Sequence, residues 1–190
     1  MTRTQIAIFA SGTGSNALNL IRYFKNHRTL EVAFVLSNNS NAKVIESAKE
    51  MGVATYLQTN AQVADGELLK RFCADRDVNW IVLAGYLRKI PTELISAYPE
   101  NIINLHPSLL PKYGGKGMYG ANVHRAVLEA KESQTGISIH LVNEEFDKGR
   151  MLAQFYCEID DSDDLSAVQE KISHLEQNYL PRVVETTILG

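Results

Sequence analysis

Asn104 and His106 are the residues whose types and spacing point most directly to chemistry. Asn104 lies in an apolar run, Ile102–Leu105, which is followed by His106 and by two prolines, Pro107 and Pro111. On an extended strand, residues two apart face the same side. An amide donor beside a protonated imidazole can stabilise an oxygen that becomes negative during acyl transfer. The alternative is a hydrogen-bonded histidine that merely caps a strand.

A carboxylate that could serve this histidine lies in a polar turn further along the chain. The turn runs from Asn143 to Gly149 and contains Asp147, and its glycine allows a tight reversal. A nearby ionised carboxylate raises the pKa of a histidine. The sequence does not show that Asp147 reaches His106, and a merely solvated acidic turn is the alternative.

A glycine-rich turn follows the first apolar run of the chain and opens a segment of helical period. The turn is Ser11–Asn16, and Gly12, Gly14 and Ala17 satisfy a permissive dinucleotide pattern. The second strand ends in Leu36–Asn39 without the acidic residue that binds ribose hydroxyls, which argues against a nicotinamide cofactor. Free N–H groups at a helix start favour a phosphate monoester. A purely structural tight turn remains the alternative.

Two other kinds of catalysis find little support. Ser108 lies in no nucleophile elbow, which argues against a serine hydrolase. The five histidines include no pair with zinc-helix spacing and have no supporting cysteine pair, so we expect no metal.

Composition excludes several classes of protein. The chain has 190 residues, 45% of them hydrophobic, and its 19 basic and 22 acidic side chains leave a net charge of -3. We therefore expect no nucleic-acid partner. The first apolar run is too short for a signal peptide or a membrane span, and the two cysteines cannot form a disulfide framework. These features predict a cytoplasmic protein without a membrane partner.

Five apolar runs separated by stretches of helical period predict an α/β fold with a Rossmann-like, open, mostly parallel sheet and flanking helices. Two further strands, separated by a polar turn, predict an antiparallel C-terminal pair, and the acidic residues at 160–164 suit the start of a last helix. We find no linker, so we expect residues 1–190 to form a single domain. The predicted strands are Ile6–Ala10, Val32–Leu36, Val53–Leu57, Trp80–Ala84, Ile102–Leu105, Gly136–Val142 and Met151–Ile159.

Three motifs of this sequence together resemble those of the glycinamide ribonucleotide formyltransferases. They are the turn Ser11–Asn16, the run Asn104–Pro111 and the turn Asp147–Gly149, and the resemblance covers nearly the whole chain in order. It implies the formyltransferase fold and 10-formyltetrahydrofolate as co-substrate. The implied substrate is 5′-phosphoribosylglycinamide, in purine biosynthesis.

The resemblance also implies a role for each matching position. Asn104, His106 and Asp147 match the catalytic residues, and Glu176 matches an acidic residue near the glycinamide amine. The matching phosphate-binding residues are Gly14, Ser15 and Asn16. The residues that match the folate site are Leu87, Arg88, Lys89, Ile90, Asn104, Asn143, Glu144, Glu145, Phe146 and Asp147.

The implied mechanism is direct attack of the amine on the formyl carbon. Asn104 and protonated His106 would stabilise the oxyanion, and Asp147 would hold the imidazolium and assist proton relay. The protein would act on these small molecules as a monomer or homodimer. The glycine-rich stretch Gly114–Gly120 is longer than the link usual in the family. Two alternatives stay open: another folate-dependent formyltransferase or hydrolase on a small phosphorylated substrate, and a non-catalytic phosphometabolite-binding module.

Overall fold

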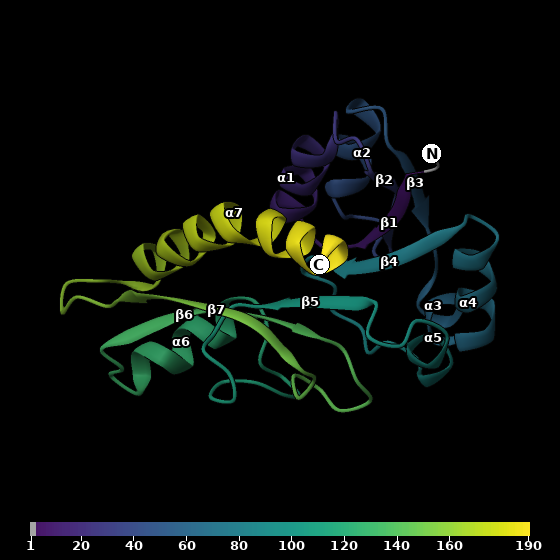
Figure 1. Cartoon of the computed structure of the whole chain (residues 1–190). Coiled ribbons are helices and arrows are strands. Elements are labelled where there is room, and N and C mark those ends of the chain that lie inside the picture. Colours follow the sequence, from purple (N-terminus) through teal and green to yellow (C-terminus); the bar gives the residue numbers. More distant parts are fainter. Residues whose placement is uncertain (1–2) are drawn as a thin grey trace. The chain divides into compact units, whose positions relative to one another are not determined.

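The computed structural model describes residues 3–190. The chain divides into two compact units, residues 1–103 and 104–190. The prediction of a single domain stays a prediction. The strand order is β3-β2-β1-β4-β5-β6-β7, and β5 (Ile102–His106) carries the chain from the first unit into the second (Figure 1).

The first unit is an alternation of strands and helices. Strand β1 pairs in parallel with β2 and β4, and β2 pairs in parallel with β3. The elements of this unit are β1 (Thr4–Phe9), α1 (Ser15–Phe24), β2 (Leu30–Ser37), α2 (Val44–Glu50), β3 (Ala54–Leu57), α3 (Asn60–Ala64), α4 (Gly66–Ala74), β4 (Val78–Leu83) and α5 (Thr92–Ala97).

The parallel strands form here because their side chains are apolar on both faces. Residues 6–10 of β1 and its continuation are at most 1% exposed, as expected for a strand covered by helices on each side. The crossover helices present apolar stripes, as their helical period predicts; Ala17, Ile21 and Phe24 of α1, for example, are buried.

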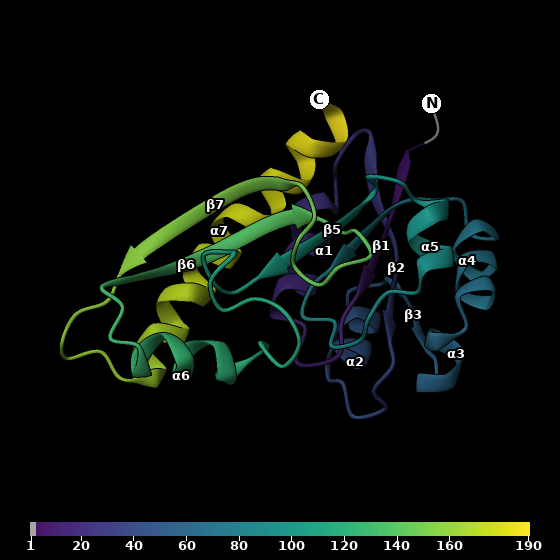
Figure 2. The same ribbon diagram turned by 90° about the horizontal axis from the view of Figure 1, so that it is seen from below.

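The second unit pairs two long antiparallel strands with two helices. Its elements after β5 are α6 (Ala121–Glu129), β6 (Gln134–Leu141), β7 (Met151–Glu158) and α7 (Leu165–Leu189). Helix α7 packs against α6 and against β6 and β7 (Figure 2). Asp164 caps α7 by accepting a hydrogen bond from the N–H of Ala167 at 2.8 Å, as the acidic stretch before the helix predicts.

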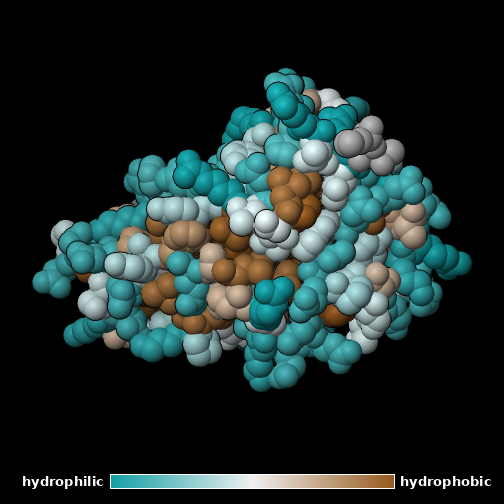
Figure 3. All heavy atoms as spheres, viewed as in Figure 1, coloured by the Kyte–Doolittle hydropathy of each residue, from teal (hydrophilic) through white to brown (hydrophobic). Residues whose placement is uncertain are grey.

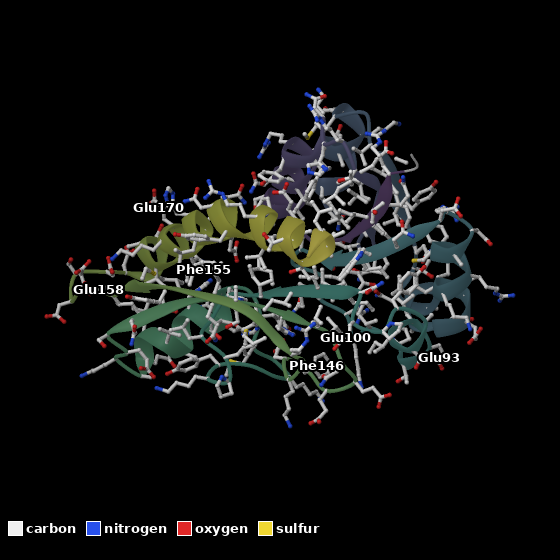
Figure 4. All side chains as sticks on the ribbon, viewed as in Figure 1. Glu93, Glu100, Phe146, Phe155, Glu158 and Glu170 are labelled. Carbon is white, nitrogen blue, oxygen red and sulfur yellow. The ribbon has the colours of Figure 1, made fainter. Side chains whose placement is uncertain are left out.

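An aromatic stack fixes α7 on its strand. The rings of Phe155 on β7 and Tyr179 on α7 are stacked with centroids 3.7 Å apart, and Phe155 lies between the two elements in Figure 4. The face seen in Figure 3 is mostly hydrophilic, with apolar surface gathered along β7 and α7.

The fold class predicted from the sequence is confirmed: the sheet is mostly parallel, has flanking helices and ends in the antiparallel β6–β7 pair. The short helices α3 and α5 were not predicted. Among residues 3–190, no helix combines the length and apolar character needed to cross a membrane.

Candidate active site

Strand β5 and the proline-containing segment after it position Asn104 and His106. His106 is 4% exposed, and Asn104 is half-buried. Ser138 on β6 fixes this segment with two hydrogen bonds. Its hydroxyl donates to the Ser108 carbonyl at 2.6 Å and accepts from the Leu110 N–H at 2.9 Å. The Leu110–Pro111 peptide bond is cis.

Asp147 reaches both of these side chains from the β6–β7 turn. Its Oδ2 lies 3.6 Å from Nδ1 of His106, and its Oδ1 accepts from Nδ2 of Asn104 at 3.4 Å. The turn is so tight that a Cβ on Gly149 would collide with the Leu141 carbonyl oxygen, and this position therefore requires glycine. The structure therefore brings Asn104, His106 and Asp147 together within the second unit.

The hydrogen bond of His106 defines its tautomer. Nε2 lies 2.8 Å from the carbonyl oxygen of Tyr113. A carbonyl only accepts, so Nε2 carries a hydrogen and Nδ1 of the neutral ring presents its lone pair toward Asp147.

The net pKa shift of His106 runs opposite to the one expected from the sequence. Burial lowers the pKa of His106 below its ordinary value, and the His140 ring adds to this. Asp147 and the Tyr113 carbonyl raise the pKa without overcoming burial. The resting protein at neutral pH thus holds a mainly neutral imidazole.

His140 on β6 is a member of the cluster that sequence reasoning missed. Its Nδ1 lies 2.8 Å from the Leu141 carbonyl oxygen, which assigns the hydrogen to Nδ1, and its Nε2 lies 3.0 Å from Nδ2 of Asn104. Nε2 is also 3.6 Å from Oδ1 of Asp147. A β-bulge at Ile139/His140 shifts the register at this point. The available signal in the sequence was a histidine between two apolar residues, Ile139 and Leu141.

Asp147 is held in its ionised form. Burial alone would raise its pKa, but its interactions with the His140 ring, the N–H of Gly115 and the His106 ring together lower the pKa of Asp147 below its ordinary value. Asp147 itself adopts φ 55°, a left-handed conformation that aspartate tolerates better than most residues.

The glycine-rich turn of the first unit has the geometry expected of an anion site. Gly14 is the N-cap of α1 with φ 81°, and no side chain caps the helix. A Cβ on Gly14 would collide with the side chain of Val44, so only glycine fits. Ser15 is exposed, and Asn16 is 8% exposed.

The segments predicted for folate binding lie in both units. Leu87 and Arg88 are exposed, and hydrogen bonds tie them to the first unit: Leu87 N–H to Ser11 Oγ at 3.1 Å and Arg88 Nε to Asn60 Oδ1 at 2.9 Å. Lys89 is exposed, whereas Ile90 is buried at 3% exposure.

The second predicted segment and the acidic residue predicted at the amine both belong to the second unit. Asn143 organises the turn by accepting from the Glu145 N–H at 3.0 Å. Glu144 is exposed, and Phe146 is 47% exposed on the same turn (Figure 4). Glu176 lies half-buried in α7.

Among residues 3–190, no group of three or more histidine, cysteine or acidic side chains is placed to hold a metal ion.

Strand β5 places the Asn104 amide and the His106 imidazole beside the Asp147 carboxylate. This arrangement fits an acyl-transfer enzyme. The sequence pattern of the formyl transferase family matches residues 4–184, and the chain belongs to this family.

Relatives with more specific names cover nearly all of the chain. It is 34% identical over 192 residues to the chloroplastic phosphoribosylglycinamide formyltransferase of Arabidopsis thaliana, covering 96% of this chain and 64% of that protein. It is 32% identical to the phosphoribosylglycinamide formyltransferase of Bacillus subtilis, over 95% of this chain and 93% of the relative. The chain thus spans slightly less than two thirds of the plant relative and most of the bacterial one.

A solved structure shows the same fold. The crystal structure of glycinamide ribonucleotide transformylase 1 from Geobacillus kaustophilus superposes with a TM-score of 0.89 at 32% identity, over 99% of this chain and all of that chain.

Proposed function

We propose that the protein transfers the formyl group of 10-formyltetrahydrofolate to the amine of 5′-phosphoribosylglycinamide, a step of purine biosynthesis. The observation that carries the proposal is the cluster in which Asp147 lies 3.6 Å from His106 and 3.4 Å from Asn104. Family membership and the names of relatives at 32–34% identity support the same reaction.

In the proposed reaction the substrate amine attacks the formyl carbon directly. A C–N bond forms, the carbonyl oxygen becomes an oxyanion, and the bond from the formyl carbon to N10 of the folate then breaks. One proton leaves the amine nitrogen and one reaches N10, so the reaction needs a group that accepts and returns a proton.

The neutral tautomer of His106 suits that task. Its Nδ1 lone pair takes the proton, directly or through a water, and the imidazolium formed is stabilised by Asp147. Nδ1 and Oδ2 are 3.6 Å apart, which is longer than a hydrogen bond and leaves Nδ1 accessible to a substrate atom or a water. The imidazolium and the amide of Asn104 then both stabilise the oxyanion.

The binding roles follow the positions described above. Gly14, Ser15 and Asn16 would hold the phosphate through N–H groups at the start of α1. Leu87–Ile90 and Asn143–Asp147 would contact the folate, and Glu176 would bind the amine. The proposal needs no metal, and it describes a cytoplasmic monomer or homodimer acting on small molecules.

The experiment is a substrate comparison with the purified protein. Formation of tetrahydrofolate should require both 10-formyltetrahydrofolate and 5′-phosphoribosylglycinamide. Release of formate without the ribonucleotide would indicate a hydrolase instead. A folate analogue that leaves the thermal midpoint unchanged, together with no turnover, would indicate a non-catalytic phosphometabolite-binding module.

A further inference from the structure

The loop between Pro111 and α6 offers backbone groups to two of the proposed catalytic side chains. The Tyr113 carbonyl oxygen lies 2.8 Å from Nε2 of His106, and the Gly115 N–H donates to Oδ2 of Asp147 at 2.7 Å. Both contacts come from the start of this loop, where Tyr113 precedes the glycine-rich stretch Gly114–Gly120 and Gly115 lies within it.

The Gly115 contact is the shortest hydrogen bond recorded for the Asp147 carboxylate among the described residues. Oδ2 is also the oxygen that faces Nδ1 of His106 at 3.6 Å. On the other oxygen, Oδ1, Asn104 donates at 3.4 Å. The Gly115 N–H therefore fixes the oxygen that must stabilise the imidazolium, and it does so with a charge-assisted bond.

The backbone shape that delivers this N–H depends on glycine at two successive positions. Gly115 has φ 90°, which side-chain-bearing residues rarely adopt. A Cβ on Gly114 would lie 2.5 Å from Leu110 Cδ2 and 3.3 Å from Asp147 Cβ, so glycine there lets the loop approach the carboxylate.

We propose that Gly115 is a positioning residue for formyl transfer, its backbone N–H holding the Asp147 carboxylate with Oδ2 turned toward His106. The inference rests on the proposed function, since it assigns Asp147 to the reaction. It gives the glycine-rich loop a part in the chemistry through a backbone group.

The chain provides a matched control in the same loop. Gly117 has φ 91°, and a Cβ at either Gly115 or Gly117 would meet no atom within 4 Å. Gly115→Ala and Gly117→Ala thus carry the same intrinsic backbone strain, but only the first displaces the N–H that binds Asp147.

The first measurement is independent of activity. The Asp147 carboxyl carbon is titrated by ¹³C NMR in the full-length protein without substrate, with its resonance assigned by its loss in Asp147→Asn. Because the Gly115 N–H lowers the pKa of Asp147, Gly115→Ala should raise that pKa, whereas Gly117→Ala should leave it at the wild-type value.

The second measurement is the steady-state turnover of Gly115→Ala and Gly117→Ala, compared on the condition that the two variants have equal thermal midpoints. Gly115→Ala should reduce kcat about tenfold or more while KM for both substrates stays within about threefold, as expected for a lost hydrogen bond to a charged group. Equal effects of the two variants on the titration and on kcat would overturn the inference and leave the loop a structural role only. Absence of turnover in the wild type would remove the proposed function, while the titration would still decide whether Gly115 holds Asp147.

Discussion

Oδ2 of Asp147 faces Nδ1 of His106 at 3.6 Å, while the other ring nitrogen of His106 is engaged by the Tyr113 carbonyl. The histidine is therefore held in one tautomer, with a proton-accepting nitrogen directed at a carboxylate. A proton taken up at Nδ1 creates an ion pair in a site where His106 is 4% exposed, and low solvent access strengthens that attraction.

Replacing the carboxylate tests this relationship. Asp147→Asn should lower the pKa of His106 further, because Asp147 raises it in the wild type. The acid limb of the kcat/KM profile should then move to lower pH, and kcat should fall about 10- to 1,000-fold. The checks are the pH–rate profile and an NMR titration of His106. An unchanged rate and profile would remove Asp147 from the mechanism.

Loss of either oxyanion donor should be costly. Asn104→Ala and His106→Ala should each reduce kcat about 100- to 1,000-fold. Because the two groups act on one oxyanion, the double variant should lose less than the product of the single effects. Steady-state kinetics of the three variants, with circular dichroism to confirm the fold, checks this. Fully multiplicative losses would show that the two side chains act independently.

His140 should act through Asn104. Its Nε2 accepts from the Asn104 amide at 3.0 Å, so His140→Ala leaves that amide without this acceptor and should reduce kcat about tenfold. His140→Gln, whose amide oxygen can accept, should recover part of the loss. His174→Ala removes an exposed histidine of α7 and should have no effect. The check is kcat of the three variants. Equal losses in His140→Gln and His140→Ala would argue against a role for His140 as the hydrogen-bond acceptor of Asn104.

Gly14 should matter for both stability and substrate affinity. Gly14→Ala places a Cβ against Val44 at φ 81°, which should cost about 1–3 kcal/mol of unfolding free energy. It should also raise KM for the phosphorylated substrate, since the start of α1 must shift. At Gly12 a Cβ meets no atom within 4 Å, so Gly12→Ala is the control. An unchanged KM in Gly14→Ala would separate this turn from phosphate binding.

Acid should destabilise the fold in two steps. Burial lowers the pKa of His106 and His124 below the ordinary value of 6.5, and the pKa of Asp147 lies below 3.8. In each case the unfolded chain binds protons first as pH falls. The free energy of unfolding should therefore decline below pH 6.5 and again below pH 3.8. Urea titrations across pH check this.

His124 lies outside the proposed catalytic cluster, and replacing it tests its share of the decline in unfolding free energy below pH 6.5. His124→Gln removes a buried group whose pKa is lowered. The decline between neutral pH and pH 5 should be shallower in this variant. An identical slope would show that His124 does not contribute.

The sequence reveals the central strands because they are mostly buried and read as continuous apolar runs, as Ile6–Ala10 does. The helices α3 and α5 have five and six residues, too few to show a helical period. The capping box formed by Thr59 and Gln62 was the one local sign of α3.

Some features of the candidate site could also be predicted from the sequence, and others could not. The two-residue spacing of Asn104 and His106 was visible in the sequence, whereas the contact with Asp147 depends on tertiary structure. The burial that lowers the pKa of His106 is also a tertiary property. Gly115 acts through a backbone N–H, which leaves no side-chain signal to find.

The most direct test of formyl transfer at this site follows the formyl carbon itself. With ¹³C-labelled 10-formyltetrahydrofolate and 5′-phosphoribosylglycinamide, NMR should show the label moving to the glycinamide nitrogen with wild-type protein and about 100-fold or more slowly with His106→Ala. Label that appears only as formate, or that moves equally fast with both proteins, would contradict the account.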